Sequence, residues 1–113
     1  MDCIFCKIAN KEIASEIVYE DDDILVFRDV NPQAPVHLLA IPKRHIDSLM
    51  EIDKIESNVL KKIFTIISKL SKEFNIDKSG FRVVSNVGEG AGQSVKHLHF
   101  HILGGRKFNW PPG

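Results

Sequence analysis

The sequence lacks several features that would place it in other classes of protein. It has no apolar run long enough to span a bilayer, and residues 1–7 lack the basic segment and apolar stretch of a secretory signal. We therefore expect a cytoplasmic protein with no membrane partner. An excess of charge of one sign is also missing, because 15 Lys and Arg residues balance 15 Asp and Glu residues. This balance argues against a partner such as nucleic acid that is held by bulk charge.

Size and composition set the domain organisation. The 113 residues, 43% of them hydrophobic, are enough to build one hydrophobic core but are few for two. We expect a single domain over residues 1–113.

Cysteine is scarce, and the two cysteines lie close together as Cys3-x-x-Cys6. In a reducing compartment this spacing favours a redox-active pair or a metal site over a structural disulfide. The cysteines alone do not decide between these two roles.

The hydrophobic pattern predicts an α+β fold, in which one long helix covers one face of a five-stranded antiparallel sheet. A short helix is expected over residues 4–9. The long helix carries an apolar stripe from Ile55 to Phe74, and Asp53 followed by Glu56 resembles a capping box at its start. Strands are expected at residues 16–20, 24–28, 37–41, 81–85 and 96–103. The sheet face opposite the long helix is left for function.

The last predicted strand holds the densest chemistry, His97-Leu98-His99-Phe100-His101. Alternate residues of a strand point to opposite faces, so the apolar residues would pack on the core and the three imidazoles would share one face. A polar strand face without function is a poor explanation for three histidines in strict alternation. A zinc site remains an alternative, because two imidazoles in a His-x-His pattern can bind one ion.

A glycine-rich segment, Gly88-Glu89-Gly90-Ala91-Gly92-Gln93-Ser94, precedes this strand. Such a turn can direct several backbone N–H groups at one anion, although a hairpin with three glycines needs no ligand. Its position beside the histidines favours a phosphate group and a phosphorus electrophile.

These motifs together resemble the histidine triad (HIT) superfamily and, within it, the Hint branch of purine nucleoside phosphoramidate hydrolases. The resemblance covers nearly the whole chain. In the N-terminal half it rests on residues 4–8, 27–29, 32–37 and 41–45. In the C-terminal half it rests on Gly92-Gln93-Ser94-Val95, the triad, Gly104-Gly105-Arg106 and the ending Trp110-Pro111-Pro112-Gly113.

The resemblance implies a catalytic mechanism for the triad. His99 would attack phosphorus and form a covalent nucleotidyl-histidine while an amine leaves, and water would then release the nucleoside monophosphate. His101 would contact the phosphate and His37 would orient the triad. Ser94 would assist proton delivery to the leaving nitrogen, with no catalytic metal required.

The resemblance also implies a nucleotide site. Asp29 would accept hydrogen bonds from the ribose hydroxyls, and Asn86 would contact the ribose and phosphate. Backbone N–H groups of the loop at Gly92, together with Gln93, would stabilise the phosphoryl oxygens. An apolar slot for the base would be formed by Phe5, Ile8, Phe27 and Val30, although each of these residues is typical of an ordinary core.

A structural zinc ion is a further implication of the resemblance to bacterial-type members. Its ligands would be Cys3, Cys6, His45 and His97, a closed set that leaves no position for catalytic water. The alternative is a pair of reduced cysteines without metal, in which case His45 is a surface residue.

The resemblance to the Hint branch implies a two-fold homodimer, in which Trp110 contacts the substrate bound by the partner subunit. Packing of Trp110 on its own subunit is the alternative. Two other function classes remain open: a zinc hydrolase that uses the histidines as catalytic ligands, and a nucleotide-binding or scaffold protein without a catalytic role.

Overall fold

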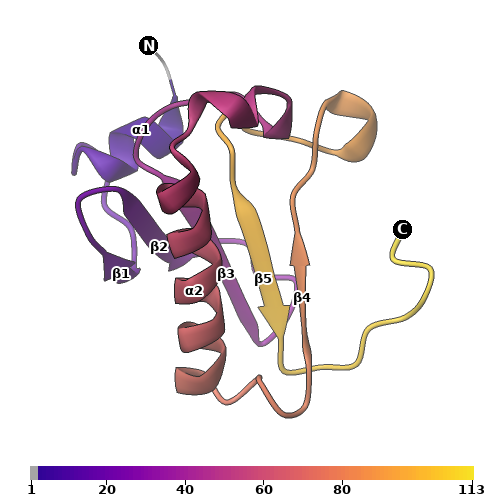
Figure 1. Cartoon of the computed structure of the whole chain (residues 1–113). Coiled ribbons are helices and arrows are strands. Elements are labelled where there is room, and N and C mark those ends of the chain that lie inside the picture. Colours follow the sequence, from indigo (N-terminus) through magenta and orange to yellow (C-terminus); the bar gives the residue numbers. More distant parts are fainter. Residues whose placement is uncertain (1–2) are drawn as a thin grey trace.

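The computed structural model describes residues 3–113 and has the predicted α+β architecture (Figure 1). The strands are β1 (Ile17–Glu20), β2 (Ile24–Arg28), β3 (Val36–Pro42), β4 (Phe81–Val84) and β5 (Phe100–Gly104). The α-helices are α1 (Ile4–Ala9) and α2 (Ser57–Glu73), and short 3-10 helices span Leu49–Lys54 and Glu89–Ala91.

The five strands form one antiparallel sheet in the order β1-β2-β3-β5-β4. Helix α2 connects β3 to β4, and β5 then inserts between these two strands. This arrangement brings His37 of β3 opposite Leu103 of β5, with His101 opposite Leu39. Residues more than 60 positions apart in the sequence therefore meet at the centre of the sheet.

Alternation along the strands gives each sheet face its own apolar cluster. Ile24, Val26, Leu38, Phe100 and Ile102 pack with α2 in the larger cluster. The smaller cluster lies on the opposite face, where the side chains of α1 meet those of β2 and β3. The sheet face that we expected to be left for function is thus partly covered by α1.

Helix α2 packs through the predicted apolar stripe, but its predicted start was wrong. Ile63, Ile67 and Leu70 are buried, and each contributes about 1.5–3 kcal/mol when fully removed from water. The helix begins at Ser57, and its N-cap Glu56 makes no capping hydrogen bond through its side chain. Asp53 lies instead in the preceding 3-10 helix, because Ile55 is extended (φ −97°, ψ 140°) and separates the two helices.

The last strand is shorter than predicted. It begins at Phe100, so His97 and His99 lie in the irregular segment that leads into β5 and only His101 belongs to the strand. Leu98 is nevertheless buried in the same cluster as Phe100, which preserves the alternation of apolar and imidazole side chains. Over residues 3–113, no helix has both the length and the apolar character that a bilayer crossing requires.

Candidate functional site

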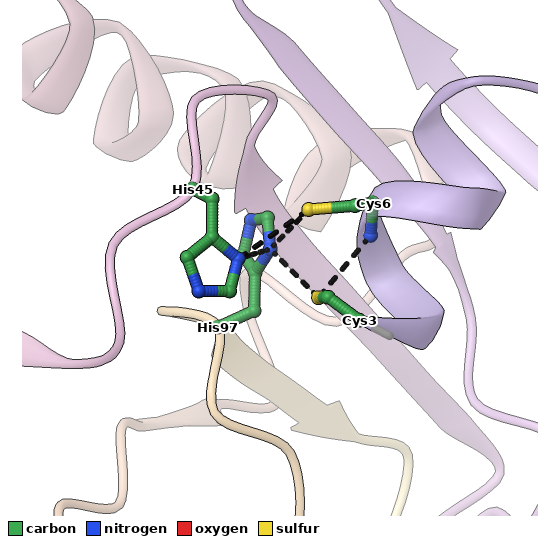
Figure 2. A group of neighbouring side chains, drawn as sticks. All are labelled: Cys3, Cys6, His45 and His97. Atoms are coloured by element: carbon green, nitrogen blue, oxygen red, sulfur yellow. Dashed lines mark hydrogen bonds between the residues drawn. The ribbon is translucent and has the colours of Figure 1, made fainter. Parts of the chain in front are cut away.

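Two cysteines and two histidines converge at the N-terminal end of α1 (Figure 2). Cys3 and Cys6 come from the start of α1, His45 from the loop after β3, and His97 from the segment before β5. The Nδ1 atom of His97 lies 3.3 Å from the Cys3 Sγ and 3.5 Å from the Cys6 Sγ. The Nδ1 atom of His45 lies 3.3 Å from the Cys6 Sγ and 3.2 Å from the His97 Nδ1.

Hydrogen bonds outside the cluster fix which imidazole nitrogen faces it. The Nε2–H of His97 donates to the Pro42 carbonyl at 2.8 Å, and the Nε2–H of His45 donates to the Asp47 carboxylate at 3.0 Å. Burial lowers the pKa of His97, which favours its neutral form. In its neutral form each ring presents an unprotonated Nδ1 to the cluster, the form in which histidine binds a metal.

The separations match those around a tetrahedral ion. With Zn–N bonds of about 2.0–2.1 Å and Zn–S bonds of about 2.3 Å, the edges are about 3.3 Å between nitrogens and about 3.5 Å between nitrogen and sulfur. Two lone pairs 3.2 Å apart with no proton between them also favour a cation at the centre. Burial, followed by the neighbouring Cys3, raises the pKa of the Cys6 thiol to about 11, so metal binding must release protons.

His97 connects this cluster directly to His99. While the His97 side chain faces the cysteines, its backbone carbonyl accepts a hydrogen bond from the Nδ1–H of His99 at 2.6 Å. In the neutral His99 ring, the unprotonated nitrogen is therefore Nε2. The ring itself is buried and packs edge-on against Phe5, with 5.1 Å between ring centroids. One oriented lone pair on a fixed imidazole is the arrangement that a nucleophile needs.

A second hydrogen-bonded pair orients His101. The backbone N–H of Gln33 donates to His37 Nδ1 at 3.0 Å, so the proton of neutral His37 is on Nε2. That Nε2–H donates to His101 Nδ1 at 2.9 Å, which leaves the proton of neutral His101 on its own Nε2. Burial, followed by the nearby His99 and His37, lowers the pKa of His101 to about 4. His101 is therefore a neutral hydrogen-bond donor at physiological pH.

Asp29, His37 and His101 also lie close enough for their side-chain ligand atoms to approach one ion. The Asp29 carboxylate is 3.4 Å from His37 Nε2. However, the hydrogen bond from the Gln33 N–H to His37 Nδ1 leaves the His37 proton on Nε2, the nitrogen that faces Asp29 and His101. That nitrogen then has no lone pair to offer an ion. The geometry favours a hydrogen-bonded network here rather than a second metal site.

A cavity of about 300 Å³ opens beside His99 and His101, within the size range of small-molecule sites. Of the residues predicted to bind or convert a nucleotide, eight line it: Phe5, Ile8, Phe27, Asp29, Val30, Ser94, His99 and His101. Most of its surface is apolar side chain, and its polar and charged lining residues are Ser15, Arg28, Asp29, Ser94, His99 and His101. Such a cavity suits a flat apolar ring joined to a polar, anionic group.

Besides the orienting His37, four residues predicted to contact the nucleotide do not line this cavity. Asn86 and Trp110 line a separate hollow beside β4, where Trp110 is 82% exposed. Gly92, a left-handed residue with φ 83°, and Gln93 do not line the cavity. The Gln93 amide instead donates to the Asp47 and Val95 carbonyls and accepts from the Gly88 N–H. Its side chain thus braces the glycine-rich loop.

Sequence reasoning missed several residues of the site. Leu39 lines the cavity, and the alternation that placed His37 on this face would have placed Leu39 there too. Asp47 orients His45 and lies only two residues away from it. Ile13, Ala14 and Ser15 also line the cavity, but nothing in their sequence marks them, because they reach it only through the turn after α1.

Comparisons with known proteins agree with this geometry. The family model described as "Scavenger mRNA decapping enzyme C-term binding" matches residues 2–109. A "14 kDa zinc-binding protein" from Brassica juncea is 45% identical over 114 residues, covering 99% of this chain and 100% of the relative.

Two solved structures are also similar to this chain in fold and sequence over most of its length. A HIT family hydrolase from Legionella pneumophila has a TM-score of 0.95 and 47% identity, with 99% of this chain and 100% of that chain covered. A histidine triad nucleotide-binding protein from Candida albicans has a TM-score of 0.84 and 34% identity, with 97% and 83% covered.

Proposed function

Because the chain belongs to the histidine triad (HIT) family, we propose that it is a nucleotide-binding hydrolase that cleaves the P–N bond of purine nucleoside 5′-phosphoramidates. Acyl-adenylates are a further candidate substrate class. The observation that carries the proposal is the hydrogen bond from His99 Nδ1 to the His97 carbonyl, because it leaves Nε2 as the attacking nitrogen beside the cavity. This assignment matches the Hint branch of the family.

The proposed reaction has two displacements at phosphorus. In the first, the lone pair of His99 Nε2 forms a P–N bond while the bond from phosphorus to the amine breaks. The amine leaves with an added proton, which the Ser94 hydroxyl at the cavity wall helps to deliver. In the second, water attacks phosphorus while the P–N bond to His99 Nε2 breaks; the proton of water passes to solvent, the nucleoside monophosphate leaves and neutral His99 is restored. The His97 carbonyl stabilises the positive charge of the nucleotidyl-imidazolium between these steps.

His101 acts on the phosphoryl oxygens. Its Nε2–H is the donor that the His37 hydrogen bond leaves available, and donors of this kind stabilise charge as it develops on oxygen. Because the pKa of His101 is lowered to about 4, its imidazole stays neutral above that pH and adds no positive charge beside His99.

The apolar wall of the cavity is the proposed binding surface for the nucleoside part of the substrate. Phe5 and Phe27 pack edge-on with 5.4 Å between centroids, and Ile8 and Val30 continue the same apolar surface. The base would lie there, recognised by shape, so that a purine fits without a fixed choice between adenine and guanine. Asp29 stands at the polar end, although one of its carboxylate oxygens already accepts from the Asn31 N–H at 2.8 Å. The other oxygen would accept hydrogen bonds from the ribose hydroxyls.

We also propose that Cys3, Cys6, His45 and His97 hold a structural zinc ion. Zinc bound by these four ligands would cross-link α1, the loop after β3 and the segment before β5. Since the ligand set is closed, we assign no reaction step to the metal.

The exposed C-terminal tail supports the proposal of a homodimer in which Trp110 contacts the substrate bound by the partner subunit. Trp110 is 82% exposed, and β4, which is 36% exposed at Val83, is an edge strand of the sheet. Exposed edge strands and aromatic residues are common at subunit interfaces. Light scattering of the purified chain, compared at several concentrations, would measure the state of assembly directly.

The function is tested by steady-state hydrolysis of adenosine 5′-phosphoramidate by the parent protein and by His99→Ala, each folded and each in excess chelator. We expect the parent rate to persist in chelator and the variant rate to vanish. A rate that disappears with chelation while the fold persists would identify a zinc hydrolase. A feeble parent rate on every amidate tried would identify a binding or scaffold protein.

A further inference from the structure

The Gly104-Gly105-Arg106 segment has a defined structure that the proposed reaction does not yet explain. Gly105 has a φ of +90°, and a Cβ atom there would lie 3.0 Å from the Cβ of Pro35. At Gly104 a Cβ atom would lie 2.8 Å from the side chain of Ile76. Both glycines therefore let the chain leave β5 in close contact with its surroundings. The result is that residue 106 lies directly against the turn that precedes His37.

Arg106 uses this position to bind the turn. Its Nε–H donates to the backbone carbonyl of Gln33 at 3.0 Å, and its Nη1 donates to the carbonyl of Lys107 at 3.0 Å. The guanidinium carbon also lies 4.3 Å from the centroid of the Phe108 ring. Stacking and two hydrogen bonds together restrict a side chain that would otherwise be mobile on the surface.

Gln33 carries the contact onward to the active site. Its carbonyl accepts from Arg106, and its N–H donates to Nδ1 of the buried His37 at 3.0 Å. His37 in turn donates from Nε2 to His101 Nδ1 at 2.9 Å. One continuous chain of hydrogen bonds thus runs from an exposed arginine to the imidazole that faces the cavity.

We propose that Arg106 is a positioning residue for His101, acting through the backbone of Gln33 and the imidazole of His37. The inference rests on the proposed function for its catalytic consequence, but its structural part does not. A neutral imidazole has two tautomers, and the Gln33 N–H selects the one in which His37 donates to His101. Arg106 holds that N–H in place, because a charged donor binds the carbonyl of the same residue.

The chain offers a matched control in Arg82, which also stacks on Phe108. The Arg82 guanidinium carbon lies 5.1 Å from the Phe108 ring, and Arg82 donates to the Asn109 carbonyl at 3.0 Å. Arg82 makes no hydrogen bond to Gln33. Arg82→Met and Arg106→Met therefore remove equivalent stacking arginines, but only Arg106→Met breaks the connection to His37.

The test is nitrogen-15 NMR of the full-length parent, Arg106→Met and Arg82→Met. Long-range imidazole spectra report the His37 and His101 tautomers, and hydrogen exchange reports the Gln33 amide. We expect both histidines of the parent to carry their proton on Nε2. In Arg106→Met, a second His37 tautomer should appear and the Gln33 amide should exchange about two- to tenfold faster, as for one lost hydrogen bond. Arg82→Met should match the parent in both measurements.

Three results would overturn the proposal. The first is a parent His37 protonated on Nδ1, which needs no variant to detect. The second is an Arg106→Met spectrum and exchange rate equal to those of the parent. The third is an equal change in Arg82→Met, which would show a general effect of the tail.

Kinetics then test the catalytic part with adenosine 5′-phosphoramidate. We expect kcat to fall about two- to tenfold in Arg106→Met while KM stays unchanged, because His101 acts on the phosphoryl group rather than on the nucleoside. A rise in KM with kcat unchanged would contradict a role through His101. If the NMR changes appear but the parent hydrolyses no nucleotide amidate, the positioning chain stands and the proposed function fails.

Discussion

Replacing His45 with alanine should weaken zinc binding while leaving the fold intact. The imidazole is 20% exposed at the edge of the cluster, and its one hydrogen bond outside it goes to the exposed Asp47. Its loss without metal should therefore cost only about 1 kcal/mol, the net value of one hydrogen bond. With metal, the variant loses one of the four zinc ligands. We take the resulting loss of zinc affinity as about 100-fold, the upper limit for mutation of residues that only hydrogen-bond to a ligand.

The expected magnitude follows from linkage between binding and folding. At free zinc about 100 times the dissociation constant of the parent, binding stabilises the parent by about 2.7 kcal/mol. A variant that binds about 100-fold more weakly gains only about 0.4 kcal/mol at the same free zinc. The difference of about 2.3 kcal/mol corresponds to about 9 °C in Tm, at about 4 °C per kcal/mol for a domain of this size.

The assay is thermal unfolding followed by circular dichroism, with free zinc set by a metal buffer. Asp47→Asn serves as the control, because it keeps all four ligands and removes only the carboxylate that orients His45. Its zinc-dependent rise in Tm should lie between those of the parent and His45→Ala. An equal rise in the parent and His45→Ala would refute the assignment of His45 as a ligand. A parent without any zinc-dependent rise would refute the metal site as a whole.

Three further predictions concern the core, pH and the tail. Leu98→Ala should lower the free energy of unfolding by about 2–5 kcal/mol, because Leu98 is 1% exposed; a loss below 1 kcal/mol in urea unfolding would contradict this packing. As the pH falls from 6.5 to 4, His101 alone should lower the free energy of unfolding by about 1.4 kcal/mol per pH unit, because the unfolded chain binds a proton that folded His101, with its pKa of about 4, does not. His101→Gln should show a flatter slope in that range, and an unchanged slope would assign the effect to other groups. Removing residues 110–113 should change the preference among amidates more than the Tm, and identical kinetics in a stable truncated protein would disprove a substrate contact for Trp110.

Much of the fold could be predicted because two periodicities dominate the sequence. Alternation in residues 98–102 correctly separates the two sheet faces, and the stripe through Ile63, Ile67 and Leu70 correctly gives the core face of α2. The start of that helix was not predictable from its capping pattern. Burial of Ile55 in an extended conformation ends the 3-10 helix, and this tertiary contact outweighs the local preference of Asp53 for an N-cap.

The site was predictable where it depends on residue identity and not where it depends on chain path. Cys3, Cys6, His45 and His97 converge as the resemblance implied, because ligand chemistry leaves a recognisable pattern in the sequence. The hydrogen bonds that select the imidazole tautomers come from the Pro42, Gln33 and His97 backbones. Backbone groups are identical in every residue but proline, so no sequence pattern could reveal these contacts.

The proposed mechanism depends most on His99 as the attacking group, and trapping the covalent intermediate is the decisive experiment. The protein is mixed with adenosine 5′-phosphoramidate, quenched within the first turnover, digested at a pH that preserves phosphohistidine, and examined by mass spectrometry. We expect an adenylyl group on the peptide that contains His99, attached through Nε2, and no such group in His99→Ala. Turnover without any adenylylated histidine, or an adduct on another residue, would contradict this mechanism.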